Sequence, residues 1–179
     1  MVVVQETGDL LHIPRAEHSL VTTAVDSAVA GFAALAKVTD DQITAFYDEF
    51  ARRLEDDASF GPIAAANVAD VVSASERDRP NGRLLLSTAM RADMIAGLRT
   101  WRDIDSRRSQ QIAEVQHARW TVQQWRDPLG VVGFVFEGRP NVFADATGVL
   151  RTGNTLLFRI GSDAPGTARP ILVAAVPPP

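Results

Sequence analysis

The chain has 179 residues, of which 46% are hydrophobic and 22% charged, and its formal net charge is −4. This is the composition of one ordinary globular domain with a core, so a disordered chain is excluded, and the acidic balance gives no footprint for a nucleic acid partner. No apolar run approaches the ~20 residues of a membrane helix and residues 1–4 do not form a signal peptide, so we expect a cytoplasmic protein without membrane contact.

The absence of cysteine is the most informative figure in the composition. It excludes a disulfide, a thiolate metal site and a cysteine nucleophile. The three histidines, His12, His18 and His117, lack the spacing of metal ligands. Neither G-x-G-x-x-G nor the P-loop pattern occurs, and H-E-x-x-H and G-x-S-x-G are also absent. The sequence therefore predicts no metal site and neither of the common phosphate loops.

The first part of the chain is predicted to be helical after a mixed, turn-rich segment, 1–14. Apolar residues recur at helical spacing, and residues typical of N-caps precede two of the segments. The expected helices are 16–38, with a stripe from Leu20 to Leu35; one that starts at the capping box of Thr39 and Gln42 and carries a stripe to Leu54; 62–76, capped by Ser59, with Ile63, Val68, Val71 and Val72 facing inward; and 84–101, after a turn at 78–82.

The middle of the chain is harder to assign. Residues 102–116 are polar and are expected to form either a charged helix or an exposed loop. Residues 120–125 alternate polar and apolar residues and carry β-formers, which predicts a strand with one solvated face. For Trp101, Trp120 and Trp125 we expect packing in the core or on a sheet rather than a binding surface.

The last part of the chain is predicted to alternate strands and helices. The run 131–136 indicates a strand buried on both faces, followed by a helix over 142–151 that Asn141 caps and Gly153 ends. A second buried strand is expected at 155–159, and Ser162 is expected to cap another helix with Asp163 in its first turn. Two parallel strands joined by a right-handed crossover follow from this order. Further prolines are expected to interrupt or stop the last helix: Pro165, Pro170 and Pro177 to Pro179.

The sequence therefore predicts an α/β protein. A mainly helical segment, 1–117, leads into the beginning of an α/β domain, 118–179, and both belong to one structural domain. The chain ends after two strands of a fold that needs more, so we expect the sheet to be incomplete.

Two stretches of the last part resemble a known family. The wording P-L-G-V-V-G-F-V-F-E-G-R-P-N-V, followed by L-R-T-G-N-T-L-L-F-R-I-G-S-D, resembles gamma-glutamyl phosphate reductase (glutamate-5-semialdehyde dehydrogenase) of the aldehyde dehydrogenase superfamily. A weaker echo lies at 65–71 and at 84–98. The resemblance concerns the N-terminal portion of that enzyme, and it implies an aldehyde dehydrogenase-like parallel (Rossmann-type) sheet. It further implies an NADP-dependent oxidoreductase of proline biosynthesis, which uses NADPH and no metal to reduce glutamyl phosphate to glutamate-5-semialdehyde through a cysteine thioester.

The resemblance also implies roles for individual residues. Asn141 would donate its side-chain amide to the developing oxyanion, with helix capping as the simpler interpretation. The loop Glu137, Gly138, Arg139 and Pro140 would face the nicotinamide half of NADPH, unless its glycine and proline serve only the turn. Arg159, Gly161, Ser162 and Asp163 would hold the adenosine ribose or its 2′-phosphate, unless Arg159 is merely paired in a surface salt bridge. The family usually has glycine where this chain has Ile160, which argues against tight cofactor binding.

Three hypotheses about function remain open at this point. The first is the N-terminal part of a reductase-like enzyme that is inactive alone, because the domain carrying the catalytic cysteine is missing. The second is a non-catalytic remnant that binds nucleotide or pairs with a full-length relative, and that is therefore a homo-oligomer or depends on a missing domain. The third is a truncated or frame-shifted product without function.

Overall fold

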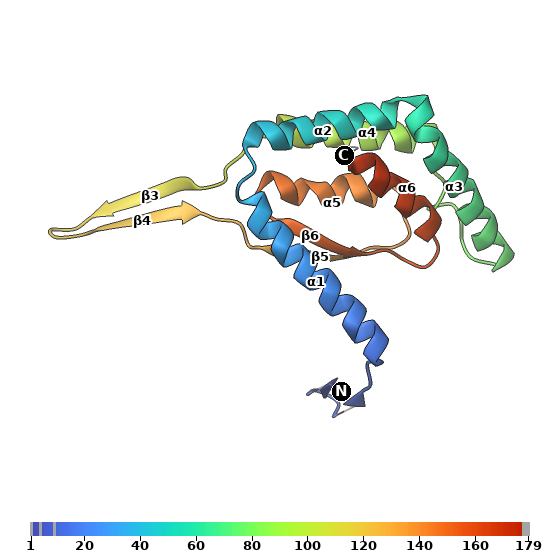
Figure 1. Ribbon diagram of the computed structural model, residues 1–179, viewed down its shortest axis with the longest axis horizontal. Coiled ribbons are helices and arrows are strands. Elements are labelled where there is room, and N and C mark those ends of the chain that lie inside the picture. The colour runs from blue at the N-terminus through green and yellow to red at the C-terminus, as the bar shows by residue number, and fades with distance from the viewer. Residues whose placement is uncertain (1, 4, 9, 177–179) are drawn as a thin grey trace.

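The computed structural model describes residues 2–3, 5–8 and 10–176 and shows a mixed α/β fold (Figure 1). The helices are α1 (Arg15–Leu35), α2 (Asp40–Glu55), α3 (Asp57–Glu76), α4 (Thr88–Asp103), α5 (Val142–Arg151) and α6 (Pro165–Ala175). The strands are β1 (Val2–Val3), β2 (Leu10–Leu11), β3 (Gln110–Gln116), β4 (Thr121–Arg126), β5 (Val131–Val135) and β6 (Thr155–Arg159).

The strands pair in three separate two-stranded sheets. The pairs β1–β2 and β3–β4 are antiparallel, whereas β5 and β6 are parallel, with Val131 opposite Thr155 and Val135 opposite Arg159. The helix α5 joins β5 to β6, because parallel strands cannot be connected by a tight turn. The predicted strand–helix–strand unit is therefore confirmed, and so is the α/β class. The prediction that both strands are buried was wrong: none of their residues is buried and Val135 is 79% exposed, because α1 covers the second face of the pair only in part.

The parallel pair has a helix on each face. Side chains alternate along a strand, and Phe134, Phe136 and Phe158 point toward α5, where Phe158 meets Phe143 edge to face with ring centroids 4.8 Å apart. Thr155 belongs to the opposite face, and its hydroxyl donates a hydrogen bond of 2.9 Å to the carbonyl of Ala28 in α1. The sheet is thus covered by α5 on one face and in part by α1 on the other.

The core lies where α2, α4 and α5 meet. Tyr47 is fully buried there, and its hydroxyl donates to the carbonyl of Thr147 at 2.7 Å. Burial raises the pKa of the Tyr47 phenol well above its usual value, so the group stays a donor at any ordinary pH. The α2 helix begins at the predicted capping box, in which Thr39 and Gln42 each bond to the other's backbone N–H.

Buried Arg151 fastens the end of α5 to its neighbours. Its guanidinium donates to the carbonyls of Ile104 and Arg102, both at 2.6 Å, and to the hydroxyl of Thr44 at 2.9 Å. Gly153 ends the helix as predicted, with a φ of +80° that a side chain would disfavour. The crossover helix is therefore fixed at its C-terminal end by both backbone conformation and a buried cation.

The N-terminus of α6 is capped by a residue that is distant in sequence, not by Ser162. The Asp70 carboxylate accepts hydrogen bonds from the Thr167 N–H at 2.6 Å, the Thr167 hydroxyl at 2.7 Å and the Gly166 N–H at 3.3 Å. The prediction for Ser162 and Asp163 was wrong, because α6 begins only at Pro165.

The prolines do not interrupt α6 either. Pro165 takes the first helical position, where its missing N–H costs nothing, and the helix continues through Pro170 to Ala175. The prediction for Pro177 to Pro179 lies outside the described residues.

Two further helix starts differ from the prediction. Asp56 caps α3 by accepting from the Ser59 N–H at 2.8 Å, so this helix begins at Asp57 rather than Pro62. Both residues are good caps, and the sequence alone does not choose between them. Ser87 caps α4, which begins four residues later than expected. Within α3, Val68 and Val72 are exposed, contrary to expectation, whereas Ile63 is buried as expected.

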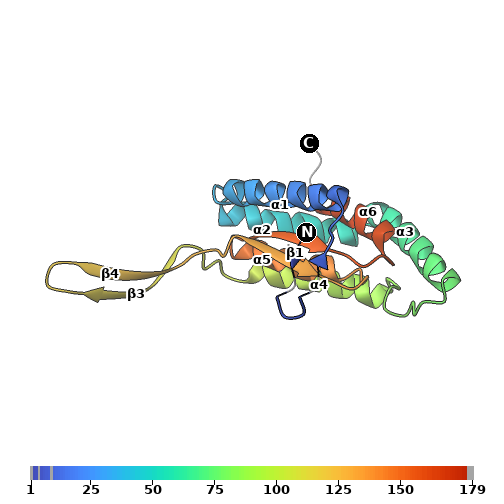
Figure 2. The same cartoon turned by 90° about the horizontal axis from the view of Figure 1, so that it is seen from below.

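The segment 102–116 contains a strand, not the expected helix or loop. Gln110–Gln116 pairs with the correctly predicted β4, and the hairpin projects away from the rest of the molecule (Figures 1 and 2). Both of its faces are exposed. Trp120 and Trp125 therefore lie in solvent, contrary to prediction, whereas Trp101 packs against the core as expected.

The α1 helix has more apolar character than the sequence expectation allowed. Within the described residues it is the one helix long and apolar enough to cross a membrane, which is weak evidence because core helices and signal sequences pass the same test. None of its residues is buried, although Thr155 of the sheet bonds to it. The expectation considered only unbroken apolar runs, and α1 includes Glu17 and Asp26.

Replacing Asp70 should destabilise the fold. We expect Asp70→Ala to lower the free energy of unfolding by about 1–3 kcal/mol, because the first turn of α6 loses its acceptor. Urea unfolding measures this, with the exposed α4 substitution Asp93→Ala as control. A cost for Asp70→Ala no larger than that of the control would show that α6 does not depend on α3.

Candidate functional site

Two loops meet at the carboxyl ends of β5 and β6. The Phe136 N–H donates to the Arg159 carbonyl at 3.0 Å, which extends the parallel pairing to the last residues of the strands. Beyond it the backbones approach closely, since a Cβ added to Gly161 would lie 3.0 Å from the nitrogen of Gly138. The absence of a side chain at Gly161 therefore permits the loops 137–139 and 161–163 to touch, whereas a Cβ at Gly138 would meet Leu84 at 3.1 Å and Ala164 at 3.4 Å.

A cleft of about 450 Å³ opens beside these loops. Open parallel sheets bind ligands at the carboxyl ends of their strands, which is where this cleft lies. Most of the residues that the sequence singled out line it: Glu137, Gly138, Arg139, Arg159, Gly161, Ser162 and Asp163. Pro140, which is fully buried, and Asn141 are not among its lining residues.

The opposite wall of the cleft comes from the connection between α3 and α4, which the sequence analysis treated only as a turn. Pro80, Arg83 and Leu84 line the cleft from this side. Arg83 reaches Glu137 at 3.0 Å, and Arg79 reaches Asp163 at 2.8 Å. Nothing in the sequence places the arginines of 77–83 beside residue 163. Their grouping was the one feature of the sequence that could have indicated a role in binding.

The cleft is rich in arginine although the chain as a whole is acidic. Arg139 lies 3.5 Å from Glu137, which it shares with Arg83. Arg159 makes no ion pair within the described residues, so the alternative of a surface salt bridge finds no support. An exposed, unpaired guanidinium at a strand end is well suited to an anionic ligand.

Asn141 does not cap α5 as the simpler interpretation had it. It has φ −67° and ψ −19°, which is helical backbone, whereas an N-cap residue is normally extended. Its side chain makes no capping hydrogen bond, and its buried Oδ1 has no partner in the described part of the chain. The side-chain amide is thus not committed to the helix.

Ile160 turns away from the cleft. Its side chain packs against both groups of buried apolar residues in the core and is absent from the cleft lining. The side chain expected to obstruct a cofactor therefore points into the protein.

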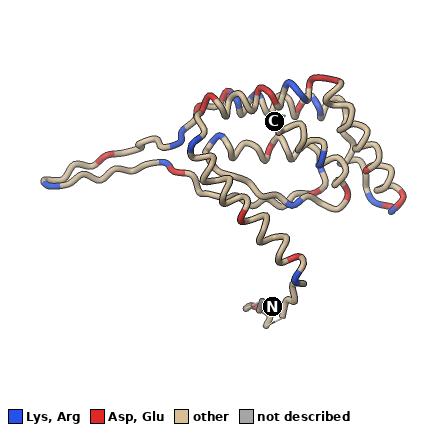
Figure 3. Tube along the Cα trace, in the orientation of Figure 1, with Lys and Arg blue, Asp and Glu red and all other residues tan. Residues whose placement is uncertain are grey.

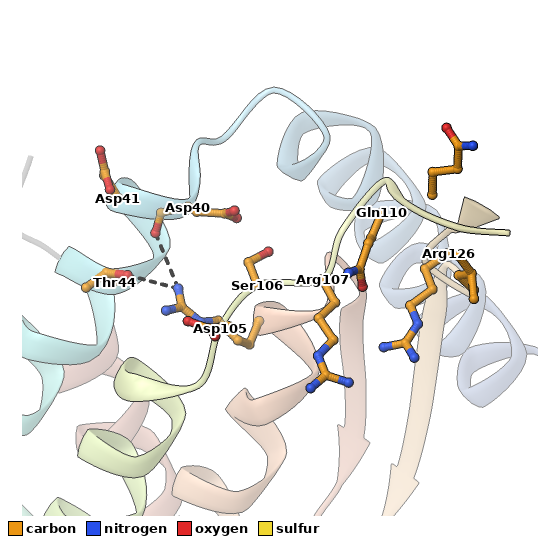
Figure 4. A pocket seen from close by; sticks show the side chains of 11 residues that line it. Asp40, Asp41, Thr44, Asp105, Ser106, Arg107, Gln110 and Arg126 are labelled. Carbon is orange, nitrogen blue, oxygen red and sulfur yellow. Dashed lines mark hydrogen bonds between the residues drawn. The ribbon is translucent and has the colours of Figure 1, made fainter. Parts of the chain in front are cut away.

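A larger cavity, of about 780 Å³, lies at the base of the hairpin β3–β4 and has no counterpart in the sequence analysis (Figure 4). Asp40, Thr44, Arg107 and Arg126 are among its lining residues. The Arg151 guanidinium at its edge is fully used by protein acceptors, including Thr44. Acidic and basic residues line the cavity in equal number, and segments of both colours lie at the base of the hairpin in Figure 3, so its charges single out neither an anion nor a cation. No group of three or more potential metal ligands occurs among the described residues.

Comparison with known proteins finds gamma-glutamyl phosphate reductases among the relatives of this chain, although no family model matches. The chain is 38% identical over 105 residues to the gamma-glutamyl phosphate reductase of Limosilactobacillus reuteri, covering 57% of this chain and 25% of that protein. It is 38% identical over 124 residues to the gamma-glutamyl phosphate reductase of Moorella thermoacetica, covering 64% of this chain and 28% of that protein. This chain is a partial homologue of the gamma-glutamyl phosphate reductases.

Solved structures agree with this relationship. The crystal structure of gamma-glutamyl phosphate reductase from Thermotoga maritima matches 87% of this chain and 38% of that one, with a TM-score of 0.78 and 25% identity. The crystal structure of the enzyme from Saccharomyces cerevisiae matches 92% of this chain and 41% of that one, with a TM-score of 0.77. At 19% identity this match supports the fold alone. The resemblance noted in the sequence is confirmed, and the chain spans between a quarter and about two fifths of these relatives.

The contact between the two loops can be tested with one methyl group. Gly161→Ala should lower the free energy of unfolding by about 1–3 kcal/mol, because the new Cβ would lie 3.0 Å from the nitrogen of Gly138 and the loop 137–139 would have to shift. Gly82→Ala is the matched control, since nothing lies within 4 Å of its added Cβ. Equal unfolding free energies for the two variants would contradict the close approach of the loops.

Proposed function

We propose that the chain is the N-terminal part of an NADPH-dependent gamma-glutamyl phosphate reductase-like oxidoreductase, and that its cleft is the cofactor site. The proposal rests on one observation above all: the predicted cofactor residues of both loops line a single cleft at the carboxyl ends of parallel strands. In this proposal β5 and β6 are the first strands of a larger Rossmann-type sheet, with 118–179 as the beginning of the cofactor domain and 1–117 as the helical segment packed on it.

Different residues of the cleft would bind different parts of the cofactor. Arg159 and the turn 161–163 would hold the adenosine ribose or its 2′-phosphate, which the unpaired guanidinium supports. The loop 137–140 would lie against the nicotinamide half. Asn141 has an uncommitted side-chain amide, and in the proposed role it would stabilise the oxyanion that forms on glutamyl phosphate, worth about 3 kcal/mol of barrier.

The chain should bind the cofactor without completing the reaction. NADPH would supply the hydride, but reduction through a thioester needs a thiolate to attack the acyl carbon and expel phosphate. The chain has no cysteine. We therefore expect this polypeptide, which we take to be cytoplasmic, to be catalytically inactive alone.

A second candidate is a non-catalytic remnant that binds nucleotide or pairs with a full-length relative. The exposed apolar side chains favour it, since Val135 on β5 is 79% and Val173 on α6 is 73% accessible. A two-stranded parallel sheet also leaves unpaired backbone along an edge. Such a chain should form a homo-oligomer or require a partner, and a monodisperse monomer that melts cooperatively would argue against it.

Cofactor binding tests the first proposal directly. Calorimetric titration of the purified chain with NADPH should show saturable binding. Arg159→Gln should lower the affinity about tenfold through the loss of a charge-assisted hydrogen bond. Arg119→Gln on the projecting hairpin is the control, since this residue also makes no ion pair within the described residues.

Two results would contradict the proposal. Absence of NADPH binding would remove the cofactor site. Turnover of gamma-glutamyl phosphate by the purified chain would show that the reaction does not need the missing thiolate.

A further inference from the structure

Two arginines at the start of the α3–α4 connection, Arg77 and Arg79, contact the turn that follows β6. The Asp163 carboxylate lies between them, with one oxygen, Oδ1, 2.8 Å from Nη1 of Arg79 and 3.6 Å from Nη2 of Arg77. The same Nη1 of Arg79 also donates to the Ser162 hydroxyl at 3.4 Å. A helical part of the chain, to which the sequence assigned no ligand-binding role, thus supplies cations to the candidate site.

The guanidinium of Arg79 is only partly used. Both of its contacts involve one nitrogen, and Nε and Nη2 make no hydrogen bond within the described residues. The Arg79 side chain is 49% exposed and that of Asp163 is 27% exposed. Arg79 does not itself line the cleft, but a planar fork of free donors remains accessible beside Ser162 and Asp163, which do.

A phosphate group would be a better partner for this fork than the carboxylate it now meets. Arginine binds phosphate through two parallel hydrogen bonds, whereas Asp163 receives one from Arg79. An exposed ion pair contributes little free energy, so exchanging it costs little. Arg77 is anchored to α3 by a 3.0 Å hydrogen bond to the Ser73 carbonyl, and it would stay beside Asp163 and neutralise it when Arg79 turns to the ligand.

We propose that Arg79, beside this cleft, is a phosphate-binding residue that makes the site prefer nucleotides with a phosphate on the adenosine ribose, and that Asp163 is its internal counter-ion, which limits this preference. The inference rests on the proposed cofactor site and adds to it a specificity-determining residue outside the two strand-end loops. Asp163 repels a ligand phosphate and competes for Arg79, whereas Arg79 attracts that phosphate. The two residues of one ion pair therefore act on nucleotide preference in opposite directions.

The preference can be measured on the full chain with two probes that differ by one phosphate. Calorimetry gives the affinities for adenosine 2′,5′-bisphosphate and for adenosine 5′-monophosphate, and their ratio is the readout. We expect the bisphosphate to bind better, Arg79→Gln to lower the ratio about tenfold, and Asp163→Asn to raise it several-fold. Arg99→Gln and Glu55→Gln are matched controls, because this exposed 2.6 Å pair lies on other helices, and they should leave the ratio unchanged.

Opposite shifts distinguish recognition from a merely structural ion pair. If the pair only held the loops together, both substitutions would weaken both nucleotides alike, which would overturn the inference. Equal affinities of the unaltered chain for the two probes would also overturn it while leaving the cofactor site intact. Failure of both probes to bind would contradict the proposed function and this inference together.

Discussion

The parallel pairing of β5 and β6 is the constraint on which the candidate site depends. Parallel strands end at the same edge, so the loops that follow them must lie side by side, and the absence of a side chain at Gly161 permits its backbone to approach that of Gly138. The crossover helix α5 connects the two strands and covers one face of the pair. Buried Arg151 and the positive φ of Gly153 fix its C-terminal end. The cleft results from this geometry together with the wall that the connection between α3 and α4 supplies.

Local signals were sufficient where the structure is determined locally. The crossover unit was predicted with nearly its observed bounds, because apolar β-branched runs and a glycine after a helix are strong local patterns. The capping box at Thr39 and Gln42 is likewise a local pattern and was predicted correctly. The site residues 137–139, 159 and 161–163 were found through a family resemblance, and the structure brings them to one cleft without testing their roles.

Signals between distant residues could not be read from the sequence. The cap of α6 comes from Asp70, nearly one hundred positions earlier, so the nearby Ser162 was chosen in its place. The strand β3 exists only because it pairs with β4, and its polar sequence fits a loop equally well. Arg79 was assigned to a turn for the same reason, although it pairs with Asp163, and no role was predicted for Arg83, which lines the far side of the cleft. Asn141 was expected to cap a helix, and its helical backbone excludes that role.

The central claim is that a nucleotide binds at the carboxyl ends of β5 and β6. Its most direct test is to locate NADPH on the labelled chain by the changes it causes in backbone amide NMR shifts. The account predicts changes concentrated at 137–139 and 161–163 and extending to 79–84 across the cleft. Changes confined to the larger cavity around Asp40, Arg107 and Arg126, or none at saturating NADPH, would contradict it.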